Sequence, residues 1–167
     1  MIVATVSESG QPSTRTLLLK GIHEGKLIFY TNYESRKGKQ LAQHPDLSLT
    51  FLWHGLNRQV HIEGTAVKTS DAESNAYFRS RPEQSQIAAR ISPQSEPIPG
   101  RLFLMKNFIT ETALWTGREI SRPDFWGGYA VTPRQMEFWQ GRSNRLHDRF
   151  LYEFRPDGQW HIERLAP

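Results

Sequence analysis

Short runs rich in β-branched and aromatic residues lie in two blocks, one at each end of the chain, and helical patterns lie between them. Clusters of Gly, Pro, Asn, Asp and Ser separate these runs, as is typical of strands joined by turns. Because the helices do not alternate with the strands, the pattern favours an α+β, mainly β, barrel over a parallel sheet. We expect strands at residues 2–6, 14–20, 27–31, 47–53, 58–67, 128–131, 135–140, 146–154 and 159–165.

The middle of the chain carries the signals of helix ends. Helices are expected at residues 35–43, 72–79, 83–91 and 102–115. Ser35 can cap the first helix, and Ser70 with Glu73 forms a capping-box pattern before the second. Pro82 stops the second helix and can lie in the first turn of the third. The three prolines and one glycine of residues 92–100 predict a loop.

A length of 167 residues fits one domain that covers residues 1–167, since domains have roughly 100–200 residues. No apolar run approaches the ~20 residues of a membrane helix, and the first residues lack the basic and apolar segments of a signal peptide. The absence of cysteine excludes disulfides, thiolate catalysis and Cys-based metal sites. We therefore expect a cytoplasmic protein that does not act at a membrane.

The charge balance narrows the ligand classes without choosing between them. Lys and Arg number 21 against 17 Asp and Glu, a net charge of +4. The basic residues form no long run, so a pocket for a small phosphorylated ligand competes well with a nucleic-acid surface. No Gly-rich dinucleotide or P-loop motif is present, and the histidines lack metal-ligand spacing, so no metal site is expected.

The first group of possible ligand-binding residues is Arg145, His147 and Arg149. On a strand, alternate side chains share one face, so these three cationic or cation-capable groups would lie together. Their mutual repulsion would be offset by an anionic or electron-rich ligand. The alternative is a solvated face of an edge strand.

Two more groups of residues suit phosphate. Ser35, Arg36 and Lys37 stand at a predicted helix N-terminus, where unpaired N–H groups and the helix dipole favour an anion. Tyr77, Arg81 and Ser85 are spaced by four and would share one helix face if the helix continued past Pro82. In both cases the alternative is a solvated, basic helix end.

Further motifs occur in register along the whole chain. They are Gln11-Pro12, Arg15 to Lys20, Phe29-Tyr30-Thr31-Asn32, Ser35-Arg36-Lys37, Arg58-Gln59-Val60, Ser80-Arg81-Pro82, Ser85-Gln86-Ile87, Gln94-Ser95, Phe125-Trp126-Gly127-Gly128, Glu137-Phe138-Trp139-Gln140-Gly141 and Arg145-Leu146-His147-Asp148-Arg149-Phe150. Together these motifs resemble those of the pyridoxamine 5′-phosphate oxidase family. Met1 falls at an internal position of the family pattern, so a family segment of about fifty residues is expected to be absent from this chain.

The resemblance implies an FMN-binding split β-barrel with helices inserted in the middle of the chain, which forms a homodimer with FMN in the subunit interface. By position, one subunit would hold FMN through Arg15, Lys20, Tyr30, Thr31, Ser35, Arg36, Lys37 and Gln59, and the other through Gln94, Ser95, Trp139 and Arg149. The phosphate of the substrate would contact Lys20, Tyr77, Arg81 and Ser85. Arg145 and His147 would lie against the pyridine ring as the catalytic residues.

The implied activity is oxidation of pyridoxamine or pyridoxine 5′-phosphate to pyridoxal 5′-phosphate, with O₂ as electron acceptor and release of H₂O₂, and of ammonia from the amine. The flavin would take the electrons, while the protein supplies orientation and charge. Two alternatives are a related flavin oxidase of a dihydrophenazine precursor and a non-catalytic binder of flavin or pyridoxal phosphate. The phosphate-binding residues disfavour the first alternative. No nucleic-acid partner is expected.

Overall fold

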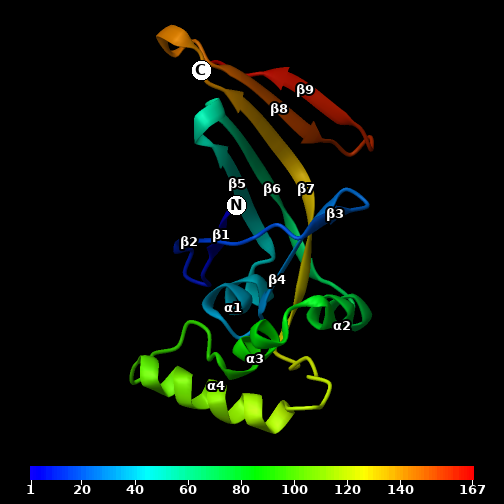
Figure 1. Cartoon of the computed structure of the whole chain (residues 1–167). Coiled ribbons are helices and arrows are strands. Elements are labelled where there is room, and N and C mark those ends of the chain that lie inside the picture. Colours follow the sequence, from blue (N-terminus) through cyan, green and yellow to red (C-terminus); the bar gives the residue numbers. More distant parts are fainter. The chain divides into compact units, whose positions relative to one another are not determined.

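The computed structural model describes all residues 1–167 and contains a nine-stranded sheet with four α-helices (Figure 1). The strands are β1 (Ile2–Val6), β2 (Pro12–Thr16), β3 (Gly21–His23), β4 (Lys26–Asn32), β5 (Asp46–Trp53), β6 (Arg58–Lys68), β7 (Trp126–Gln140), β8 (Asp148–Phe154) and β9 (Trp160–Arg164). The helices are α1 (Arg36–Gln43), α2 (Asp71–Ser80), α3 (Glu83–Ile91) and α4 (Arg101–Trp115). The mainly β class with helices in the middle of the chain is therefore confirmed.

The strands pair in the order β2-β1-β5-β6-β7-β4-β3, and β8 pairs with β7 and with β9. The chain divides into two compact units, one of residues 1–29, 40–67 and 130–167 and the other of residues 30–39 and 68–129. We call them the strand unit and the helical unit and describe each by itself. The prediction of one domain over residues 1–167 stays a prediction.

The core of the strand unit consists of inward-facing aliphatic and aromatic side chains from several strands. Val3, Phe29, Leu49 and Val131 are fully buried. In β5 the residues from Asp46 to Thr50 alternate between outward and inward, as expected for a strand with one face against a core. The structure has no helix long and apolar enough to cross a membrane.

The helical unit is built around Phe78, which is fully buried with Ile87, Ile120 and Trp126. The predicted capping box is confirmed, because the Ser70 hydroxyl accepts a bond from the backbone N–H of Glu73, whose carboxylate accepts from the backbone N–H of Ser70. Figure 1 shows α3 beside α4, and the two helices contact each other.

The strands differ from the prediction in four places, one of them the run 146–154, which is a strand only from Asp148. The run 14–20 ends as a strand at Thr16, because the chain leaves its pairing with β1 and the backbone N–H of Lys20 instead bonds the Ile28 carbonyl. The three-residue strand β3 was not predicted. Thr132-Pro133 does not interrupt β7, because the ladder with β8 begins only at Gln135 and the missing N–H of Pro133 leaves that ladder intact.

Gly64 of β6 allows a close approach of two strands. A Cβ atom at this position would clash with the carbonyl oxygen of Thr132 and press on a side-chain methyl of Val131. We expect Gly64→Ala to lower the free energy of unfolding by about 1–3 kcal/mol, the range typical of overpacking. The matched control is Gly55→Ala, where a Cβ meets nothing within 4 Å. Denaturant titration of the two variants gives the comparison, and equal stability would contradict this account.

Candidate functional site

The N-terminal turn of α1 brings together four of the residues predicted to hold the cofactor. The Lys37 side chain is buried, and its Nζ donates to Thr31 Oγ1 at 3.1 Å, to Ser35 Oγ at 3.2 Å and to Gln94 Oε1 at 2.9 Å. Gln94 therefore contacts Lys37 of its own chain. That Gln94 serves the cofactor of the other subunit stays a prediction.

The same turn has the properties of an anion site. The side chain of Ser35 is fully buried, and its hydroxyl donates to the Asn32 carbonyl at 2.7 Å and lies 3.4 Å from the backbone N of Gly38. The first turn contains Arg36 and Lys37 and no acidic residue. Cations at the positive end of a helix are unfavourable unless an anion binds there. The backbone and side-chain donors of this turn therefore fit a phosphate ester.

A second cluster in the helical unit surrounds Arg81. The rings of Tyr30, Tyr77 and Trp126 are nearly parallel, with centroids 3.8 Å apart for Tyr30–Tyr77 and 5.5 Å for Tyr30–Trp126. The guanidinium carbon of Arg81 lies 4.7 Å from the centroid of the Trp126 ring. Burial lowers the pKa of Arg81 and raises the pKa of Tyr30.

The helix does not continue past Pro82, so the predicted common face of Tyr77, Arg81 and Ser85 does not form. Helix α2 ends at Ser80, and Arg81 has an extended backbone with ψ 150°. The residue before a proline is pushed out of the helical region, which accounts for the break. Tyr77 and Arg81 nevertheless meet at the aromatic cluster, through their shared contacts with Trp126.

In the strand unit, Arg15 is held by a network of short side chains. Its guanidinium donates to Thr5 Oγ1 at 2.6 Å, to Ser13 Oγ at 2.8 Å and to the Val3 carbonyl at 3.2 Å. Both hydroxyls in turn donate to Oε1 of Gln40, at 2.5 Å from Thr5 and 3.0 Å from Ser13. Gln40 is buried on α1 and so fixes the position of Arg15 through two hydroxyl groups.

Lys20 lies beyond the end of β2, in the segment that leads to β3, and its side chain is exposed. The alternation of a regular strand therefore does not govern which way Lys20 faces relative to Arg15.

The end of β7 collects other predicted residues of the strand unit. Gln59 and Trp139 line one cavity of about 350 Å³ together with Arg58, Arg142 and Asp148. The ring centroids of Trp139 and His147 are 4.8 Å apart. The Nδ1 atom of His147 accepts a hydrogen bond from the backbone N–H of Arg142, which fixes the ring and leaves Nε2 as its other nitrogen.

The predicted strand face of Arg145, His147 and Arg149 is wrong, because β8 begins only at Asp148. Arg145 instead ends a single 3₁₀ turn, Ser143–Arg145, and its backbone has φ +61°. Ser95 is another predicted site residue with positive φ, at +76°. Such a conformation is costly for a residue with a side chain, and it is found preferentially where function requires it.

Arg149 forms a two-bond ion pair with Glu137. Its Nε and Nη2 lie 2.7 and 2.9 Å from the two carboxylate oxygens, and its Nη1 donates to the Ala166 carbonyl at 2.9 Å. The hydrogen bonds from Arg149 hold the pKa of Glu137 below its ordinary value. The pair joins β7 and β8 to the last residues of the chain.

Because the pKa of Glu137 is lowered in the folded state, its ionised form stabilises the fold above the ordinary Glu pKa, and this contribution is lost as the pH falls through the lowered value. We expect Glu137→Gln to be less stable than the parent at neutral pH, with the difference shrinking as the pH falls below the ordinary Glu pKa of about 4.3 and vanishing only below the lowered value. Denaturant unfolding between pH 3 and 8 measures this. Glu153→Gln, which removes a more exposed pair with Arg155, is the control and should cost less at pH 7. A pH-independent difference would contradict the assignment.

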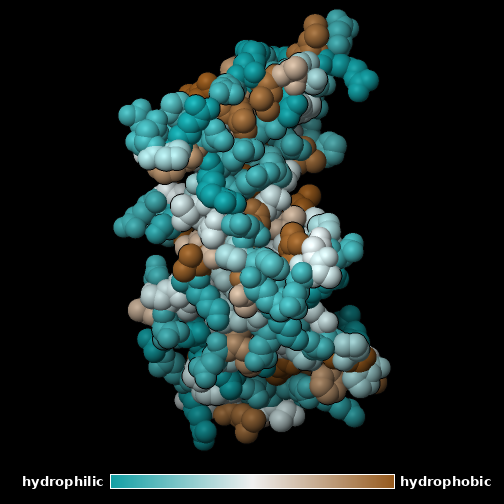
Figure 2. Space-filling view, turned by 180° about the vertical axis from the view of Figure 1, so that it is seen from behind, coloured by the Kyte–Doolittle hydropathy of each residue, from teal (hydrophilic) through white to brown (hydrophobic).

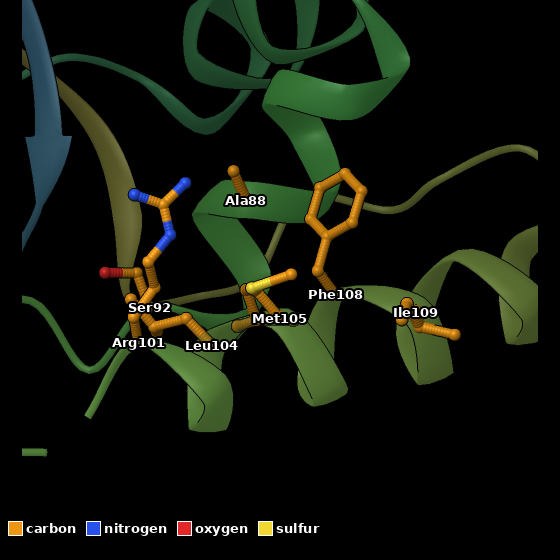
Figure 3. Close-up of a pocket in the computed structure, with 8 residues that line it drawn as sticks. Ala88, Ser92, Arg101, Leu104, Met105, Phe108 and Ile109 are labelled. Carbon is orange, nitrogen blue, oxygen red and sulfur yellow. The ribbon is translucent and has the colours of Figure 1, made fainter. Parts of the chain in front are cut away.

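A further groove of about 530 Å³ lies between α3 and α4 and is lined mainly by apolar side chains, among them Leu104, Met105 and Phe108 (Figure 3). Arg101 and Ser92 lie at one end of it. It contains none of the predicted site residues.

The sequence analysis gave no supporting role to Gln40, Glu137 or Trp126. Their roles depend on contacts between segments far apart in the chain, such as Gln40 with Thr5 and Glu137 with Arg149. The only sequence signal for these residues is their type, since Gln40 carries an amide and Glu137 an acid that can bond an arginine.

Comparison with known proteins gives the family. The sequence pattern described as "Pyridoxamine 5'-phosphate oxidase" matches residues 1–113, and that described as "Pyridoxine 5'-phosphate oxidase C-terminal dimerisation region" matches residues 126–167. The chain is 66% identical to a pyridoxine/pyridoxamine 5′-phosphate oxidase of Bacteroides thetaiotaomicron and 56% identical to one of Porphyromonas gingivalis, in each case over all of this chain and 78% of the relative.

Solved structures agree on the fold. PhzG of Burkholderia lata, crystallised with tetrahydrophenazine-1-carboxylic acid, has a TM-score of 0.92 and 30% identity, over 99% of this chain and 81% of that one. A pyridoxamine 5′-phosphate oxidase-related FMN-binding protein of Nostoc punctiforme has a TM-score of 0.76 and 20% identity, over 99% and 86% of the two chains. The predicted split barrel is thus confirmed. The chain belongs to the pyridoxamine 5′-phosphate oxidase family of FMN-dependent oxidoreductases.

Proposed function

We propose that the protein oxidises pyridoxamine 5′-phosphate or pyridoxine 5′-phosphate to pyridoxal 5′-phosphate, with O₂ as the electron acceptor. The alcohol and O₂ give the aldehyde and H₂O₂, while the amine, O₂ and water give the aldehyde, ammonia and H₂O₂. The reaction belongs to vitamin B6 metabolism, and a cytoplasmic location is part of the proposal. Relatives named pyridoxine/pyridoxamine 5′-phosphate oxidase are 50–66% identical to this chain over its whole length.

The observation that carries the proposal is the state of Arg81. This side chain forms no ion pair and donates no hydrogen bond within the chain, and its Nη1 is buried without a partner. A guanidinium nitrogen that is buried without a hydrogen-bond partner is costly. A phosphate ester of the substrate supplies the missing acceptor, with Tyr77 beside it and Ser85 in the first turn of α3.

The residues at the start of α1 fit the phosphate of FMN. Lys37 and Arg36 supply cationic donors, and the first turn of α1 supplies backbone N–H groups. Arg15, oriented through Thr5 and Ser13, is a further donor for the cofactor, as are Thr31, Ser35 and Gln59. The chemistry that FMN supplies when bound is the acceptance of two electrons from the substrate and their transfer to O₂.

The chain's own residues bind and orient the substrate. Arg81, Tyr77, Ser85 and Lys20 hold its phosphate, and Arg145 and His147 lie against its pyridine ring. Alignment of the reacting carbon contributes up to about 7–11 kcal/mol to such a reaction, so no strong general base is needed. The hydrogen bond to Nδ1 fixes the imidazole of His147, while the positive φ of Arg145 sets where its exposed side chain leaves the backbone.

A homodimer with FMN in the interface completes the proposal. It is supported by the family region described as a dimerisation region, which covers β7, β8 and β9. Figure 2 shows apolar side chains gathered at the end of the strand unit that carries β8 and β9. Exposed there are Phe154, Trp160 and Ile162, and a patch of this kind marks an interaction surface.

The function is tested by purifying the protein, recording its flavin absorption and following oxygen uptake. We expect a yellow protein that consumes O₂ with pyridoxine 5′-phosphate and forms H₂O₂ and pyridoxal 5′-phosphate in equal amounts. Unphosphorylated pyridoxine is the control. A yellow protein without uptake would leave only a binding role.

Arg145 should matter most for turnover. We expect Arg145→Ala to keep FMN bound while kcat falls at least about tenfold, because the ring of the substrate is no longer held in a reactive alignment. Steady-state oxygen uptake and flavin fluorescence measure the two quantities. Arg134→Ala, an exposed arginine of the same unit, is the control. Unchanged turnover in Arg145→Ala would contradict the role.

The second candidate is oxidation of a reduced phenazine, favoured by the TM-score of 0.92 with PhzG. The compound bound in that structure is a carboxylic acid without phosphate, which would leave the donors of Arg81 less well matched. Oxygen uptake with a dihydrophenazine carboxylate and none with pyridoxine 5′-phosphate would favour this candidate.

A further inference from the structure

We propose that Trp126 is a positioning residue for substrate phosphate, which acts by holding the guanidinium of Arg81 on the face of its indole ring. The inference rests on the proposed function and deepens it. Arg81 recognises the phosphate dianion, and an aromatic ring beneath it, in place of an acidic side chain, holds it in position.

The side chain of Arg81 lies against aromatic rings. Its guanidinium carbon lies 4.7 Å from the Trp126 ring centroid and 5.7 Å from that of Phe78. The backbone is fixed as well, since the Arg81 carbonyl accepts a hydrogen bond from Gln86 Nε2 at 2.8 Å, and the Arg81 N–H bonds the Phe78 carbonyl. The side chain thus starts from a fixed point and rests on two aromatic rings.

Two other arginines of the helical unit, Arg90 and Arg122, have acidic partners. Arg90 also lies over an indole ring, 4.6 Å from the Trp115 centroid, but it forms an ion pair with Glu111 at 2.6 Å. Arg122 pairs with Asp71. Arg81 has the aromatic contact without the carboxylate, so its position is set while its charge is not neutralised.

Trp126 is itself held in place by its neighbours. Its ring is 6% exposed and forms an edge contact with the fully buried Phe78 at 5.2 Å. The Tyr77 ring is parallel to it within 4°. Trp126 therefore contacts both the guanidinium of Arg81 and the ring of Tyr77, and supports the two together.

These facts have a consequence for binding. A cation over an aromatic face is more strongly attracted as it loses water, and Arg81 is half-buried with its Nη1 fully buried. An acidic partner would fix the same arginine but would also repel a phosphate dianion. Holding the cation on an indole ring keeps the site preorganised and its donors directed to the ligand. Loss of the ring should weaken binding of phosphate esters and leave the chemical step largely unchanged.

The test compares Trp126→Leu with Trp115→Leu, which removes the other indole under an arginine and lies in the same unit. Ligands are pyridoxal 5′-phosphate and unphosphorylated pyridoxal, added to the FMN-loaded protein. We expect Trp126→Leu to raise the Kd of pyridoxal 5′-phosphate and the KM of pyridoxine 5′-phosphate at least about tenfold. The Kd of pyridoxal, the Kd of FMN and kcat should each change less than about threefold, and Trp115→Leu should leave all of them near the parent values.

Two further variants keep the test decisive. Trp126→Phe retains an aromatic face and should recover most of the phosphate affinity, including where the leucine variant does not fold. In an Arg81→Ala background, Trp126→Leu should add less than about a twofold effect, because the two residues act as one unit. Independent effects of the two substitutions, or equal weakening of pyridoxal and its phosphate, would overturn the inference. If the parent protein does not bind pyridoxal 5′-phosphate, the proposed function fails with it, whereas normal binding by Trp126→Leu removes the role of Trp126 alone.

Discussion

A positive charge taken out of water must be compensated, and the helical unit of this chain buries the Lys37 side chain and the Nη1 atom of Arg81. Lys37 is buried among three neutral oxygens at the start of α1, and Arg81 lies on an indole ring. Burial on this scale is unfavourable for a cation unless hydrogen bonds or a counter-charge offset it. In the proposed function, the phosphate of the cofactor would supply the counter-charge of Lys37, and the phosphate of the substrate that of Arg81.

Different kinds of chemical group orient the candidate site residues. Arg15 is oriented by hydroxyl groups that donate to Gln40, His147 by a backbone N–H, and Arg81 by aromatic rings. Only Arg149 is fixed by a carboxylate, which partly neutralises its charge. Neutral supports orient a cation without competing with an anionic ligand. Arg149 also bonds the Ala166 carbonyl and so joins β7 and β8 to the last residues, while its predicted contact with the cofactor of the other subunit stays a prediction.

The sequence predicted the helices and most strands well because their ends carry local signals. The capping box at Ser70 and the proline at position 82 set the boundaries of α2 and α3, and both act through neighbouring backbone atoms. The segment before β8 was predicted wrongly because the left-handed backbone of Asn144 and Arg145 has no unambiguous local sequence signal. The positions of the site residues could be named through the family resemblance. The partners that hold them, such as Gln40 and Trp126, come from contacts that no local pattern encodes.

The contacts of residues 164–167 bear on how the protein can be tagged for purification. The backbone N–H of Leu165 bonds the Arg149 carbonyl, and residues 164–167 line a cavity together with Leu146 and His147. An affinity tag fused directly after Pro167 would therefore emerge beside the imidazole of His147. A cleavable linker at that end, or purification without a tag, preserves the native surroundings of His147.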